Sequence, residues 1–256
     1  MPNLPRSSRL ASPVDTAAHG EYRISQRPDD PRPLYRFTGH VVDDPQPGRY
    51  HIYAGWFCPW SQRVTIARAL AGLEDAVTVS YVDNQRDGRG WAFRERYGPD
   101  PVNGFTLLRH AYEATEEGFD GHVSVPTLWD RHLARVVSND FAGIGIDLAT
   151  RFGRLANPVA ETYPEALREE IESLDLSIGS PARLAALDER LAGREYLVGG
   201  VLTEADIRLW VHLARLGPSL ADHPNLLRYA RALYAIPAFR DTTDFTTFAH
   251  PDWTLA

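Results

Sequence analysis

The sequence predicts an α/β domain followed by an all-helical domain. Two β-prone runs, residues 50–54 and 77–82, flank a helical pattern, and this strand–helix–strand order implies a parallel pair with a right-handed crossover. After Asn157 no strand of consequence is apparent, while apolar residues recur at helical spacing. A chain of 256 residues is long enough for two domains.

The first 46 residues are expected to form an extended arm. They are rich in proline and charge, with breakers such as Asp29-Asp30-Pro31-Arg32-Pro33, so regular structure is not expected there. The arm either lies on the following domain or is partly disordered.

The α/β domain is assigned to residues 47–152. Pro59 suits the first turn of a helix, where its missing N–H costs nothing, and Gly72 can end that helix. Residues 130–132 separate two strand-like runs and predict a hairpin, and residues 138–140 offer N-caps for a further helix. The expected order is β-α-β-α-β-β-α, with strands at residues 50–54, 77–82, 123–129 and 133–137 and helices at about 59–72, 107–112 and 138–152.

The all-helical domain is assigned to residues 153–256. Leucine and isoleucine at helical spacing predict helices over about 167–178, 184–191 and 226–233. Thr203-Glu204-Ala205-Asp206 resembles a capping box, with Asp in place of Glu, at the start of another helix. Asp206 is therefore interpreted as a structural cap and not as a catalytic acid.

Composition excludes several function classes. The formal net charge of −7 argues against a general nucleic-acid binder, and all 27 Lys or Arg positions are Arg, which codon bias in a GC-rich genome explains. A single cysteine allows no intramolecular disulfide, and the nine histidines show no paired ligand spacing, so no metal site is expected.

The N-terminus lacks the apolar core of a signal peptide, and no apolar run approaches the ~20 residues that span a bilayer. The expectation is a cytoplasmic protein that binds neither nucleic acid nor membrane.

Cys58 is the candidate nucleophile. Cys58-Pro59-Trp60-Ser61 falls at a strand-to-helix junction, where free backbone N–H groups and the helix dipole stabilise an anion. A thiol there is expected to ionise more readily than a free cysteine, and the thiolate is the reactive form. Because Ser61 stands where a dithiol motif has its second cysteine, a second thiol must come from solution. The alternative is a buried, inert cysteine.

Val125-Pro126 is a second candidate, because a proline inside a strand removes a ladder donor. In thioredoxin-like folds, a cis peptide at such a position brings a backbone N–H and C=O next to the active helix, where they bind a thiol peptide like an added strand. We therefore expect a thioredoxin-like α/β domain in which a cis Val125–Pro126 bond faces Cys58. The alternative is an edge-strand proline.

A series of segments between about residues 47 and 245 carries a recognisable pattern. In order, they are Arg49-Tyr50-His51-Ile52-Tyr53, Cys58-Pro59-Trp60 with Arg63, Gly90-Trp91-Ala92-Phe93, Val125-Pro126-Thr127-Leu128-Trp129-Asp130, Tyr163-Pro164-Glu165-Ala166-Leu167-Arg168, Tyr196-Leu197-Val198-Gly199 and Leu202-Thr203-Glu204-Ala205-Asp206-Ile207-Arg208-Leu209. Together they resemble the Xi class of the glutathione S-transferase superfamily, the glutathionyl-hydroquinone reductases, and the resemblance is that of a shortened and divergent member.

The resemblance implies removal of glutathione from a glutathionyl-hydroquinone. Cys58 would attack the substrate's sulfur, the hydroquinone would leave, and a second glutathione would release Cys58 as glutathione disulfide. Trp91 would pack on the thiol. The alternative interpretation is that Trp91 is a loop aromatic that fills the domain interface. The implied partners are a small-molecule thiol and an aromatic or quinone-type substrate, and the family leads us to expect a homodimer.

The chain departs from the family at the residues that bind the γ-glutamyl end of glutathione. Asp140-Phe141 stands where the family has Glu-Ser, and His122 stands where an Arg usually precedes the Val-Pro strand. His122 is cationic only part of the time near neutral pH, unlike Arg. Trp91, Val125, Pro126, Asp140 and His122 are the candidate thiol-binding residues.

These departures predict weak glutathione binding and better use of a thiol without a γ-glutamyl group. Mycothiol, which some actinobacteria with GC-rich genomes use, is one such thiol. The family's insertion is also missing between Ser177 and Ser180, and its tyrosine-rich tail is reduced to residues 245–248. The identity of the aromatic substrate therefore stays open too. Two further interpretations stay open: an omega-like thioltransferase or dehydroascorbate reductase, and a non-catalytic binding module on the transferase fold.

Overall fold

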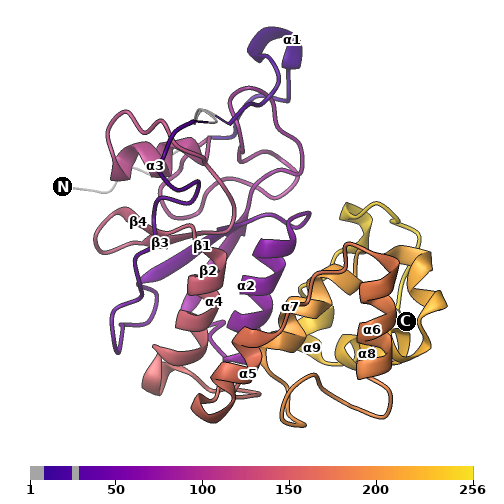
Figure 1. Ribbon diagram of the computed structural model, residues 1–256. Coiled ribbons are helices and arrows are strands. Elements are labelled where there is room, and N and C mark those ends of the chain that lie inside the picture. Colours follow the sequence, from indigo (N-terminus) through magenta and orange to yellow (C-terminus); the bar gives the residue numbers. More distant parts are fainter. Residues whose placement is uncertain (1–8, 25–28, 256) are drawn as a thin grey trace. The chain divides into compact units, whose positions relative to one another are not determined.

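The computed structural model describes residues 9–24 and 29–255, which divide into two compact units (Figure 1). The first unit holds the residues up to Gly55 together with Asp75–Ile144. The second unit holds Trp56–Glu74 and the residues from Gly145 onward. The helix that follows the first strand therefore belongs to the same unit as the C-terminal helices.

A four-stranded mixed sheet forms the centre of the first unit. Its order is β2-β1-β3-β4, with β1 parallel to β2 and antiparallel to β3, and with β3 antiparallel to β4. The predicted parallel pair and hairpin are thus confirmed. The elements of this unit are β1 (Tyr50–Ala54), β2 (Val77–Tyr81), α3 (Arg109–Thr115), β3 (Thr127–Asp130) and β4 (Arg135–Ser138).

The strand predicted from residue 123 begins only at Thr127. The Val125–Pro126 peptide bond is cis, as predicted, and Pro126 has no N–H to donate to a neighbouring strand. The carbonyl of Ser124 is taken by side chains instead, since it accepts from the hydroxyls of Tyr112 (3.1 Å) and Thr127 (2.6 Å). The prediction that this segment is regular strand is therefore wrong.

The hairpin turn is also longer than predicted. The Asp130 carboxylate accepts from the N–H groups of His132 (2.8 Å) and Leu133 (3.0 Å), and Ala134 adopts a left-handed φ of 50°. These contacts extend the turn and delay the start of β4 to Arg135.

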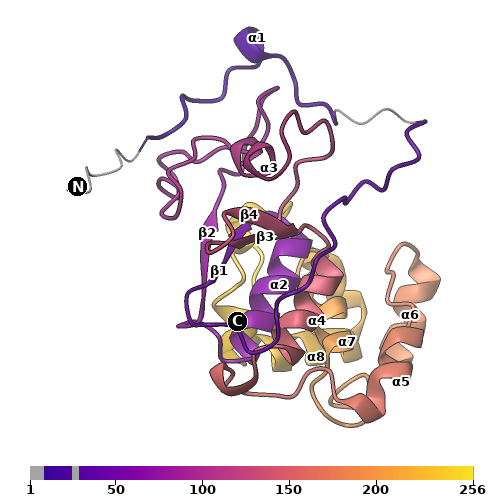
Figure 2. The same cartoon turned by 90° about the vertical axis from the view of Figure 1, so that its left-hand side faces the viewer.

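The described part of the arm lies on the first unit, as one of the two alternatives predicted. Ala11 N–H donates to the Phe93 carbonyl (2.9 Å), and Asp15 N–H donates to Asp87 Oδ2 (3.1 Å). The arm does contain one regular turn, α1 (Thr16–His19), because Asp15 caps it by accepting from Ala18 N–H at 2.8 Å. Figure 2 shows α1 on the same side of the sheet as α3.

Helices make up the second unit. They are α2 (Pro59–Leu70), the part of α4 (Phe141–Thr150) from Gly145 onward, α5 (Arg168–Ser173), α6 (Pro181–Arg190), α7 (Glu204–Leu213), α8 (Pro224–Tyr234) and α9 (Pro237–Arg240). Helix α2 packs against α7 and α9 (Figure 1). Gly72, with φ of +63°, ends α2 as predicted, and a Cβ there would lie 2.1 Å from the Asn157 carbonyl oxygen.

The helix predicted over residues 167–178 is wrong beyond Ser173. Arg208, from α7, donates to the carbonyls of Ile171 (2.9 Å) and Leu174 (2.7 Å), which a longer helix would need for its own ladder. In contrast, the predicted capping box is confirmed, because Asp206 accepts from Thr203 N–H at 2.7 Å. In the part of the chain that the structure describes, no helix is long and apolar enough to cross a membrane.

Candidate functional site

Cys58 is the N-cap residue of α2. Pro59 occupies the first helical turn, and the backbone N–H of Ser61 donates to Cys58 Sγ at 3.4 Å. Cys58 is 6% exposed. Cys58 therefore occupies the predicted helix start, with a backbone N–H group directed at its sulfur.

Arg215 is a second functional candidate beside Cys58, and the sequence did not reveal it. It follows α7, and its guanidinium donates to the carbonyls of Phe57 (3.4 Å) and Val211 (2.7 Å) and to Gln62 Oε1. Burial lowers the pKa of Arg215 to about 10, and the charge of Cys58 acts in the opposite direction. Arg215 is thus a buried cation that interacts electrostatically with Cys58.

The Arg215 side chain is also fixed by an aromatic ring. Its guanidinium carbon lies 4.0 Å from the centroid of the Phe248 ring. One signal in the sequence could have identified it: Arg215 lies four residues after Val211, on the same face as the apolar residues of α7. A cation on such a face needs a partner.

A buried ion pair joins α2 to α7 one turn from Cys58. Arg63 Nη2 contacts Glu204 Oε1, and the two side chains are 11% and 5% exposed. Burial raises the pKa of Glu204 to about 7, although the charges of Arg63 and Arg208 lower it. The free-energy cost of removing this carboxylate from water therefore exceeds its favourable electrostatic interaction with the two guanidinium groups.

In the first unit, Trp91 and His122 are linked through Arg86 and Tyr22. The Arg86 guanidinium carbon lies 3.9 Å from the Tyr22 ring centroid and 4.2 Å from that of Trp91. Tyr22 Oη and His122 Nδ1 form a hydrogen bond of 3.1 Å. Two predicted thiol-binding residues are thus brought together by an arm residue and a loop cation that were not predicted.

Asp140 and Phe141, the other two residues that differ from the family pattern, lie next to this group. Tyr35, also from the arm, has its ring centroid 6.1 Å from those of both His122 and Phe141. Asp140 accepts from Ala142 N–H at 3.1 Å, so its carboxylate is engaged at the start of α4. We refer to Tyr22, Tyr35, Arg86, Trp91, His122 and Phe141 as the Arg86 cluster. The predicted position of Val125–Pro126 opposite Cys58 stays a prediction.

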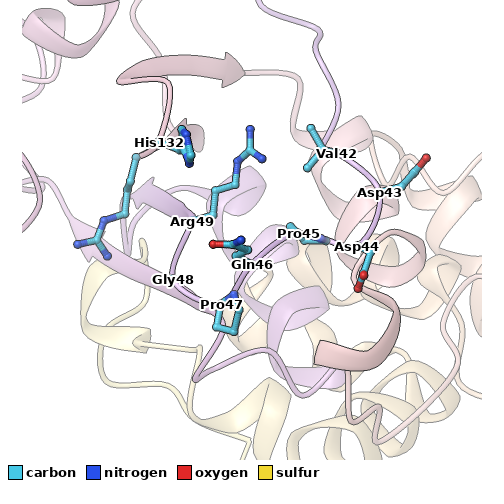
Figure 3. Close-up of a pocket in the computed structure, with 10 residues that line it drawn as sticks. Val42, Asp43, Asp44, Pro45, Gln46, Pro47, Gly48, Arg49 and His132 are labelled. Carbon is cyan, nitrogen blue, oxygen red and sulfur yellow. The ribbon is translucent and has the colours of Figure 1, made fainter.

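A separate hollow lies at the other end of β1 from the segment that leads to Cys58. It has a volume of about 590 Å³ and is lined by residues 42–49 with Arg131 and His132 (Figure 3). In Figure 3, His132 lies on one side and Asp43 and Asp44 lie on the other. None of the predicted thiol-binding residues lines this hollow, so we do not assign the thiol site to it. Within residues 9–24 and 29–255, no group of three His, Cys, Asp or Glu side chains could hold a metal ion.

Comparison with known proteins identifies the family. The glutathione S-transferase N-terminal domain model matches residues 57–151, and the C-terminal domain model matches residues 182–232. The glutathionyl-hydroquinone reductase PcpF of Sphingobium chlorophenolicum is 34% identical, over 72% of this chain and 71% of the relative. The glutathionyl-hydroquinone reductase YqjG of Escherichia coli is 31% identical, over 77% of this chain and 72% of the relative.

Solved structures agree with these sequence matches. The Xi glutathione S-transferase of Phanerochaete chrysosporium superposes with a TM-score of 0.74 at 31% identity, over 84% of this chain and 89% of that chain. Glutathione-bound YqjG from Escherichia coli gives a TM-score of 0.73 at 30% identity, over 80% of each chain. The predicted fold, a thioredoxin-like N-terminal domain with a helical C-terminal domain, is confirmed. The chain therefore belongs to the glutathione S-transferase family, in its Xi class.

Proposed function

We propose that this protein is a thiol-dependent reductase of glutathionyl-hydroquinones that acts through a mixed disulfide on Cys58. The observation that carries the proposal is the position of the chain's one cysteine, at the N-cap of α2 with a backbone N–H directed at its sulfur. Two relatives more than 30% identical are named glutathionyl-hydroquinone reductases, which supports the same chemistry.

The reaction has two steps that balance. In the first, the Cys58 thiolate attacks the substrate's sulfur, the carbon–sulfur bond breaks, and the aromatic carbon takes the electron pair and a proton to give the hydroquinone. In the second, a glutathione thiolate attacks the glutathionyl sulfur of the mixed disulfide and releases Cys58. The glutathionyl group of the substrate and one free glutathione become glutathione disulfide, and the aromatic product is reduced by two electrons. Arg215 would stabilise the Cys58 thiolate in both steps.

Replacing Cys58 with serine tests the proposal. The serine variant should bind glutathione but release no hydroquinone from a glutathionyl-hydroquinone, as followed by chromatography, and the wild-type protein should accumulate a glutathione adduct on Cys58 by mass spectrometry. Ser61→Ala is the matched control, since it removes the hydroxyl at the second dithiol position and should keep turnover. Wild-type-like turnover in the Cys58→Ser variant would place the chemistry elsewhere.

Omega-like chemistry is the second candidate. A Schizosaccharomyces pombe protein named glutathione S-transferase omega-like 2 is 26% identical over 80% of both chains. The same Cys58 would then reduce small mixed disulfides or dehydroascorbate, and steady-state rates on these substrates against a glutathionyl-hydroquinone separate the two. Mycothiol in place of glutathione as the resolving thiol, and a homodimer, are further proposals that thiol competition and light scattering test.

A further inference from the structure

We propose that Arg86 binds a carboxylate group of the thiol co-substrate. The inference rests on the function proposed above, because it takes Trp91 as part of the thiol site. It assigns a ligand-binding role to a residue outside the family motifs, and it makes the N-terminal arm part of that site through Tyr22.

Arg86 is a cation without a counter-ion in the part of the chain that the structure describes. Its partners there are the Tyr22 and Trp91 rings, and no described carboxylate or carbonyl accepts a hydrogen bond from it. Its neighbours differ: Arg89 and Arg94 contact the Asp87 carboxylate at 2.7 and 3.7 Å. The nearest carboxylate in sequence is thus used by other cations.

The stacking leaves the hydrogen-bond donors of Arg86 available. The guanidinium carbon lies over both rings, 3.9 Å from the Tyr22 centroid and 4.2 Å from the Trp91 centroid, so the cation contacts the faces of the two rings. The five N–H donors of a guanidinium point outward in its own plane, in a fork that matches the two oxygens of a carboxylate. Arg86 is only partly buried, so a small anion can reach those donors.

His122 is not the cation of this cluster at neutral pH. Burial lowers the pKa of His122, and the positive charge of Arg86 lowers it further. The ring nitrogen Nδ1 is also engaged with the Tyr22 hydroxyl at 3.1 Å. The positive charge next to Trp91 therefore resides on Arg86, and the charge of a bound carboxylate would be compensated there.

The arm holds this arrangement from the outside. Tyr22 contacts Arg86 with its ring and His122 with its hydroxyl, and a Cβ on Gly90 would lie 3.6 Å from the Tyr22 ring. Arg89 fixes the preceding stretch of the arm by donating to the Pro13 carbonyl at 2.8 Å. The thiol that suits such a site carries a carboxylate, as glutathione does. A neutral thiol such as mycothiol would offer Arg86 nothing to bind, so this proposal and the use of mycothiol exclude each other, and thiol competition decides between them.

Calorimetric titration at pH 7 with two thiols tests the proposal. Glutathione and its diethyl ester, in which both carboxylates are neutralised, are titrated into the wild-type protein and into Arg86→Gln. Charge-assisted hydrogen bonds contribute about 1.5–3 kcal/mol, so Arg86→Gln should weaken glutathione binding by about 10- to 150-fold. The ester should bind the wild type weakly and should bind both proteins equally. Arg96→Gln, an exposed arginine in the same unit, makes the same change of charge and should leave both affinities unchanged.

Two outcomes overturn the proposal. One is an ester that binds the wild type as tightly as glutathione, which needs no variant. The other is an Arg86→Gln variant that binds glutathione within twofold of the wild type. If Arg86→Gln does not fold, Arg86→Lys keeps the charge without the planar fork and should show an intermediate loss. Because binding is measured without turnover, a wild type that binds glutathione through Arg86 yet releases no hydroquinone would refute only the proposed function.

Discussion

Replacing Glu204 with glutamine should stabilise the protein at alkaline pH, although it removes one partner of a buried ion pair. The Glu204 side chain is 5% exposed and lies between α2 and α7. Arg63 from α2 and Arg208 from α7 both favour its charged form, while burial, and to a lesser degree Glu172 on α5, disfavour it. Burial prevails, so the pKa of Glu204 rises from 4.5 to about 7.

This change of pKa sets both the sign and the size of the effect. The folded protein holds the Glu204 proton more tightly than the unfolded chain does. Protonation of Glu204 therefore contributes stability to the fold that is fully present below about pH 4.5 and is lost as the pH rises to about 7. A pKa that moves from 4.5 to about 7 corresponds to about 3 kcal/mol. Protonated Glu204 resembles glutamine in shape and charge. The variant should therefore match the wild type near pH 4.5 and exceed it by up to about 3 kcal/mol at pH 8.

Urea unfolding at pH 5, 6, 7 and 8, followed by circular dichroism, measures the difference between the two proteins. Glu189→Gln, on the exposed face of α6, is the control for the same change of charge. A wild type that becomes more stable than Glu204→Gln as the pH rises would refute the reasoning. It would show that the attraction of the carboxylate to Arg63 and Arg208 exceeds the free-energy cost of burying it.

Two further substitutions address the site and its support. Arg215→Met should slow alkylation of Cys58 by iodoacetamide at pH 7 by about tenfold, because it removes the buried positive charge that interacts with Cys58. Arg231→Met, at an exposed arginine on α8, is the control and should leave the rate unchanged. Equal rates for all three proteins would exclude an electrostatic role for Arg215. Asp206→Ala should lower the free energy of unfolding by about 3 kcal/mol or more, since it leaves two backbone N–H groups and the Tyr229 hydroxyl without their acceptor. Asp252→Ala is the exposed control for urea unfolding, and a loss below about 1 kcal/mol at Asp206 would mean that water replaces the cap.

The features that the sequence predicted well depend on short stretches of chain. Cys58 as N-cap needs only Pro59 behind it and a strand before it, and the capping box needs only Thr203 and Asp206 three residues apart. The cis bond at Val125–Pro126 was predicted from one proline in an apolar run and is present. Local geometry determines each of these, so local patterns suffice.

The features that the sequence missed depend on residues from distant segments. Helix α5 stops at Ser173 because Arg208 takes its carbonyls, and nothing in residues 167–178 carries that information. Arg215 is near Cys58 only because α7 packs on α2. Helical spacing predicts where a helix can form, but a side chain from another helix can end it earlier.

The binding preference for the thiol shows the same limit most clearly. Asp140, Phe141 and His122 predict a weakened hold on glutathione, because motif positions are compared one at a time. In the folded protein the cation lies at Arg86, between Trp91 and an arm residue. A charge that binds a carboxylate can come from any segment that reaches the same place, so a lost motif residue does not by itself mean a lost contact. Tyr22 belongs to the arm, so if Arg86 binds the thiol as proposed, loss of the Tyr22 ring should change both the affinity for the thiol and the packing of the arm.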